Sequence, residues 1–110
     1  MIMGLFNKKK TVQPVKEEAL ENGELPWGWI TKHEAFTKPI MDKQKEYIAA
    51  WVNAPLGSFE KKEALSKYLH FLLSTQSTCE IKGECYSKWF SDIVADQKQI
   101  IKLQQELSAL

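Results

Sequence analysis

From residue 65 onward, an apolar side chain recurs at every seventh position of the sequence. Seven residues are close to two turns of an α-helix, so residues with this spacing lie on one helix face. The positions are Leu65, Leu72, Cys79, Tyr86, Ile93, Ile100 and Leu107. One continuous helix over this range would be about 70 Å long. Because that is too long for a compact domain of 110 residues, we expect a break between about Gln76 and Gly83.

The wider pattern predicts an all-α single domain, in which three main helices form a small bundle. We expect these helices at residues 38–54, 58–77 and 84–109. "NAPLGS" ends the first helix, and Ser58 is expected to cap the second, with Glu60 in its first turn. The second helix has the widest apolar face, and we therefore expect it to be central. The first helix has one apolar face, made of Ile40, Tyr47, Ile48, Trp51 and Val52.

The long C-terminal helix would reach about 39 Å at 1.5 Å per residue. Since its partner helices are shorter, its last turns are expected to project beyond the bundle with an apolar edge. Such an edge favours a protein partner or a second copy of the chain. The residues expected to make this contact are Ile100, Leu103, Leu107 and Leu110.

The N-terminal part divides into a tail at residues 1–12, a short helix at 13–24, and an arm with a short helix at 25–37. Within "LPWGWITKHE", Thr31 and Glu34 have the spacing of a capping box and predict a helix that starts near Lys32. Pro39 disfavours helix just before it, which predicts a break and a restart capped by Thr37.

Two tryptophans, Trp27 and Trp29, stand two residues apart in this arm. In an extended segment they point to the same side. We interpret them as a lid over the helix bundle. The alternative is a small-molecule or peptide pocket formed by Trp27, Trp29 and His33, because indole faces bind cations and planar ligands.

Charge argues against nucleic-acid binding. All 15 basic residues are lysine, no arginine occurs, and the net charge is +1. Recognition of phosphates and base edges favours arginine and a basic stripe. No apolar run approaches the about 20 residues of a spanning helix, and "MIMGLFNKKK" lacks the order of a secretory signal. We expect a cytoplasmic protein in which residues 1–10 could at most make a weak peripheral membrane contact.

Candidate chemistry is sparse. Five residues separate Cys79 and Cys85, whereas paired zinc ligands have two to four between them. A metal site that recruits His33 and His70, or a disulfide across a loop, remains open, but buried reduced thiols are the simplest interpretation. His70 falls on the polar helix face. We assign no catalytic, cofactor-binding or metal-binding residue, and we expect a non-enzymatic interaction or scaffold protein.

The segments "LPWGW" and "FTKPI", followed by "GEC" with a tryptophan shortly after, resemble small helical proteins of low-GC Gram-positive bacteria. The lysine-only basic set fits such a source. The resemblance spans residues 25–93. No activity is known for that family, so the resemblance implies no functional residue.

Overall fold

The computed structural model describes Leu20 and residues 23–110. It is all-α, as the apolar spacing predicts. The expected tail at 1–12 and nearly all of the expected helix at 13–24 lie outside the described residues. The elements in chain order are α1 (Trp29–Lys32), α2 (Glu34–Asn53), α3 (Phe59–Lys82), α4 (Glu84–Trp89), the π-helical turn η3 (Phe90–Val94) and α5 (Gln97–Ala109).

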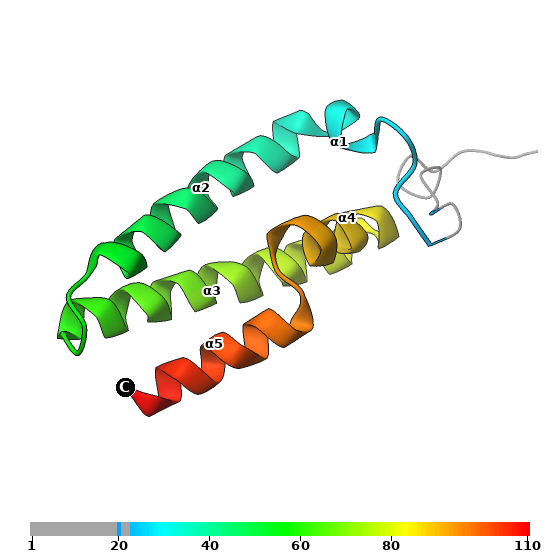
Figure 1. Ribbon diagram of the computed structural model, residues 1–110. Helices are drawn as coiled ribbons and strands as arrows, with labels where there is room; N and C mark the ends of the chain where they lie inside the picture. The colour runs from blue at the N-terminus through cyan, green and yellow to red at the C-terminus, as the bar shows by residue number, and fades with distance from the viewer. Residues whose placement is uncertain (1–19, 21–22) are drawn as a thin grey trace, which may run out of the picture.

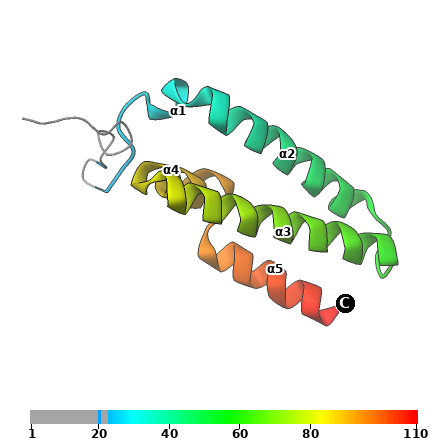
Figure 2. The same cartoon turned by 180° about the vertical axis from the view of Figure 1, so that it is seen from behind.

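Helix α3 is the centre of the fold, as its wide apolar face predicts (Figure 1). Helices α2 and α3 form an antiparallel hairpin, while α4 packs on the C-terminal half of α3 and α5 on its N-terminal half. The view from behind shows the same order, with α3 between α2 and α5 (Figure 2). The buried positions of α3 include Leu65, Leu72 and Cys79, each at most 1% exposed. Within α3, the seven-residue stripe therefore lies in the interior of the bundle, whereas Ile93 further along it is 47% exposed.

Helix α2 begins earlier than the sequence suggests. It starts at Glu34 and runs through Pro39, so the expected break at Lys38 does not occur. Pro39 is exposed and lies in the second turn, where its missing N–H removes only one helical hydrogen bond. The expected cap residue, Thr37, is instead buried inside the helix at 3% exposure.

Helix α3 also departs from the prediction. Its N-terminus is capped as expected, because the Ser58 hydroxyl accepts a hydrogen bond from the Lys61 amide at 3.1 Å. However, it continues through the expected break and ends only at Lys82. Gly83 then reverses the chain with φ 145° and ψ 176°, a backbone conformation that essentially only glycine adopts.

Replacing Gly83 by asparagine is expected to lower the free energy of unfolding by about 1–3 kcal/mol, because a side chain strains this conformation. Gly57→Asn is the matched control. Gly57 has φ 76°, a left-handed conformation that asparagine tolerates, with open space around its Cα. This control should lose less than about 1 kcal/mol. Urea unfolding of both variants checks the difference, and equal losses would contradict the role assigned to Gly83.

The prediction of one continuous helix over residues 84–109 is wrong. This segment is divided into α4, η3 and α5, with Ala95 in an extended conformation between the last two. Asp96 starts α5 with a capping box: its carboxylate accepts from the Gln99 amide, and the Gln99 side chain accepts from the Asp96 amide, both at 2.9 Å. The chain thus bends inside the apolar stripe, and α5 returns along α3 instead of projecting from the bundle (Figure 1).

A buried amide holds this bend. Gln44 occupies a position in the apolar face of α2 and is 8% exposed. Its Nε2 donates to the Val94 carbonyl oxygen at 2.9 Å and to the Tyr68 hydroxyl at 3.3 Å. Because the helix ends after Val94, that carbonyl lacks an ordinary helical partner. The Gln44 side chain supplies the donor from another helix.

Gln44→Leu should therefore lower the free energy of unfolding by about 1–3 kcal/mol, because the Val94 carbonyl is left buried without a donor. The same substitution at exposed Gln105 should change it by less than about 0.5 kcal/mol. Chemical denaturation measures both. If Gln44→Leu is neutral, the polar contact does not stabilise the bend.

Candidate functional site

The segment "LPWGW" forms a tight turn instead of an extended arm. The Trp29 amide donates to the Pro26 carbonyl at 3.1 Å, and Gly28 has φ 80° and ψ 4°. These values fit a type II turn with glycine at its third position. The turn points the two tryptophans into different surroundings, so the expectation that they share one side is wrong.

Trp29 belongs to the core at 2% exposure. The ring of His33 stacks on it, with centroids 4.3 Å apart, and the edge of Tyr86 meets it at 5.0 Å. The Nδ1 of His33 donates to the Trp29 carbonyl at 2.8 Å. His33 is thus half-buried between α1 and α2. This cluster joins the start of the hairpin to α4.

The capping box expected at Thr31 and Glu34 is not formed. Thr31 lies within α1, which follows Gly28, and α2 follows His33; neither helix start has a side-chain cap. The carboxylate of Glu34 is in the first turn of α2, where its charge favours the helix dipole.

Trp27 is 96% exposed. It borders an open hollow of about 590 Å³ together with Gly28, Thr31 and Lys32. Trp29 and His33, the other two residues of the alternative pocket, do not line this hollow. The lid interpretation therefore applies to Trp29 alone, and the three-residue pocket expected from the sequence does not exist as one site.

Four residues of the C-terminal helix are expected to bind a partner. Because α5 packs back on α3, these residues differ in burial and do not form one exposed surface. Ile100 is 1% exposed and belongs to this chain's own core. Leu103 and Leu107 are half-buried against that core, and Leu110 is exposed. Ile100 is therefore unavailable to a partner.

The return of α5 creates an apolar surface that the sequence did not suggest. Leu110 comes to border the same hollow as Phe59, at the end of the molecule where α2 turns into α3. Leu56 is 90% exposed and Phe59 73% exposed. We call this surface the apolar tip. By this name we mean the exposed apolar side chains around the α2–α3 turn, Val52, Leu56, Phe59 and Leu110, of which Phe59 and Leu110 border one hollow.

A lysine holds the backbone under this tip. The Lys61 ammonium donates to the Trp51 carbonyl at 2.7 Å and to the Ala54 carbonyl at 3.3 Å. These are carbonyls at the C-terminal end of α2, where a positive charge is favourable. The turn that displays Leu56 is thereby fixed to the first turn of α3.

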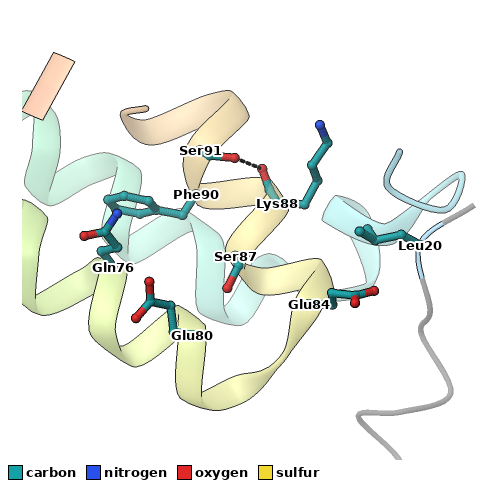
Figure 3. A pocket seen from close by; sticks show the side chains of 8 residues that line it. All are labelled: Leu20, Gln76, Glu80, Glu84, Ser87, Lys88, Phe90 and Ser91. Carbon is teal, nitrogen blue, oxygen red and sulfur yellow. Dashed lines mark hydrogen bonds between the residues drawn. The ribbon is translucent and has the colours of Figure 1, made fainter. Parts of the chain in front are cut away.

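Two hollows lie along the bundle. One, of about 370 Å³, lies between α2 and α5 over Tyr68. The other, of about 360 Å³, lies between the C-terminal part of α3 and α4 (Figure 3). Its polar side chains include Glu80, Glu84 and Ser91, and the Ser91 hydroxyl donates to the Lys88 carbonyl at 3.1 Å. The lining described for this second hollow includes no histidine or cysteine.

The two cysteines are buried thiols, as the simplest interpretation expects. Cys79 is fully buried on α3, and Cys85 lies just beyond the Gly83 reversal. Burial raises the pKa of the Cys79 thiol from 9.0 to about 11, against a smaller opposing effect of Lys82. Since the thiolate is the reactive form, this environment makes Cys79 unreactive.

With Cys85 replaced by alanine, Cys79 should react with a maleimide at pH 8 at least about 100-fold more slowly in the folded protein than in urea. The raised pKa also means that the protonated thiol stabilises the folded state below pH 9, and that this contribution is lost as the pH rises through 11. Equal labelling rates in the folded and unfolded protein would contradict the burial of this thiol.

Other chemistry finds little support in residues 23–110. No three histidine, cysteine, aspartate or glutamate side chains among them gather as they would to hold a metal ion. His70 is exposed. In the same part of the chain, no helix combines the length and the hydropathy needed to cross a bilayer. The chain matches no protein-family model, no curated protein and no solved structure.

Proposed function

We propose that the protein is a non-enzymatic interaction protein that self-associates through the apolar tip. The observation that carries the proposal is the exposure of Leu56 and Phe59, at 90% and 73%, on a turn that is itself held in place. Large apolar side chains gathered on a monomer's surface mark interaction sites. Leu110 belongs to the C-terminal helix, from which the sequence predicts self-association. The other residues of the tip belong to the region where α2 turns into α3, and Ile100 is not among them.

A second copy of the chain is the partner that the tip fits. Glu60 directly follows Phe59 in the sequence, Lys62 lies three residues after it, and both are exposed. In a two-fold pairing the same patch faces itself, so charges of opposite sign beside the apolar centre can face each other across the axis. The tip has four apolar residues, well below the roughly 20–30 residues per partner of a stable interface. The expected association is therefore weak and reversible.

Sedimentation velocity of the full chain tests this proposal. The weight-average mass should rise toward that of a dimer as the concentration increases to about 500 μM. Leu56→Glu and Phe59→Glu should each keep the chain monomeric at that concentration, because a carboxylate at the centre of an apolar interface is desolvated without a partner. Both positions are exposed, so the fold should survive, which circular dichroism verifies.

Ile81→Glu is the matched control. Ile81 is 84% exposed on the opposite end of α3, so it presents as much apolar surface as the tip residues but lies away from them. This variant should associate like the wild-type chain. A wild-type chain that stays monomeric at about 500 μM would refute self-association, and an equal effect of Ile81→Glu would show that the tip is not the interface.

A further inference from the structure

The groove between α2 and α5 has the properties of a small-molecule site. It exists because α5 changes direction after Ala95, so α2 and α5 both pack on α3 while a space stays open between them. Its volume of about 370 Å³ lies within the range of ligand pockets, roughly 300–1,000 Å³. It lies beside the Gln44 contact that supports the bend.

The walls of the groove are apolar and partly aromatic. Trp51 and Tyr68 form one side, with ring centroids 6.1 Å apart and planes tilted by 33°. Ile48 and Leu103 contribute aliphatic surface from α2 and α5. Flat aromatic molecules gain most from such surfaces, because rings stack or meet edge to face.

Two hydrogen-bond donors in the groove favour a ligand that carries a polar acceptor group. Tyr68 is 6% exposed, and its hydroxyl accepts a hydrogen bond from Gln44. Among the described residues, that hydroxyl has no acceptor for its own proton, although buried donors normally have one. Lys102, which is exposed, brings an ammonium group to the same groove, with Glu106 one turn further along α5. An oxygen acceptor in the ligand would satisfy the hydroxyl.

We propose that this groove binds a small aromatic molecule that carries an anionic oxygen group, such as a carboxylate or a sulfonate. The ring packs against Trp51 and Leu103, and the oxygen accepts the proton of the Tyr68 hydroxyl while Lys102 balances the charge. The site is distinct from the apolar tip, because none of the four tip residues lines the groove.

Two fluorescent probes of the same skeleton test the proposal on the full chain. 8-Anilinonaphthalene-1-sulfonate carries the anionic oxygens, and N-phenyl-1-naphthylamine lacks them. The sulfonate probe should bind one molecule per chain with a Kd on the order of 10 μM. Tyr68→Phe should weaken its binding about 5- to 10-fold and leave the neutral probe within about twofold, because it removes the hydroxyl group, and only the sulfonate accepts that hydroxyl's proton.

Filling the groove gives a second, steric test. Leu103→Trp should weaken both probes at least about 10-fold, because the larger ring occupies their space. Ile101→Trp is the matched control: Ile101 is exposed on the same helix outside the groove lining, so both probes should bind this variant within about twofold of wild type. Circular dichroism and thermal unfolding establish that each variant is folded.

The results separate this site from the tip. Phe59→Glu should leave probe binding unchanged; if that variant abolishes binding, the probes sit on the tip and the groove proposal is overturned. It is also overturned if folded Leu103→Trp binds the probes like wild type, or if Tyr68→Phe weakens both probes equally. None of these outcomes depends on whether the chain self-associates.

Discussion

The hydrogen bond from the Gln44 amide to the Val94 carbonyl is the contact on which the C-terminal half of the structure depends. A helix that ends within a core leaves carbonyl groups without donors, and each such group costs about 1–3 kcal/mol. Gln44 reaches across from α2 and satisfies one of them at 2.9 Å. The chain can therefore leave the helix at Ala95 while Val94 and Ala95 both stay buried. A polar residue in an apolar helix face here specifies the path of the chain.

That path creates both surfaces to which we assign a function. Because α5 returns along α3, Leu110 arrives beside Phe59 at the tip, and Leu103 arrives opposite Trp51 across the groove. The proposed self-association and the proposed ligand binding thus both depend on this path of the chain, although they use different residues.

Much of the helical pattern could be predicted from the sequence, because it depends on local spacing. The apolar face of α3 and its Ser58 cap are correct. The capping box of Asp96 and Gln99 has an equally local signal, an aspartate followed three residues later by glutamine. It lies within an uninterrupted apolar stripe, and that stripe predicts one continuous helix over residues 84–109. Thr31 and Glu34 carry the same kind of signal, yet the Gly28 turn starts the helix earlier and leaves that signal unused.

The sequence by itself determined that this chain is helical and which side chains share a helix face, since both follow from residue type and spacing. Only the tertiary structure decided which apolar side chains are buried. Trp27 and Trp29 are the same residue type two positions apart, yet one is 96% exposed and the other 2%. The difference arises from His33 and Tyr86, which pack on Trp29 alone. Burial depends on partners that folding brings from elsewhere in the chain, and local spacing does not contain that information.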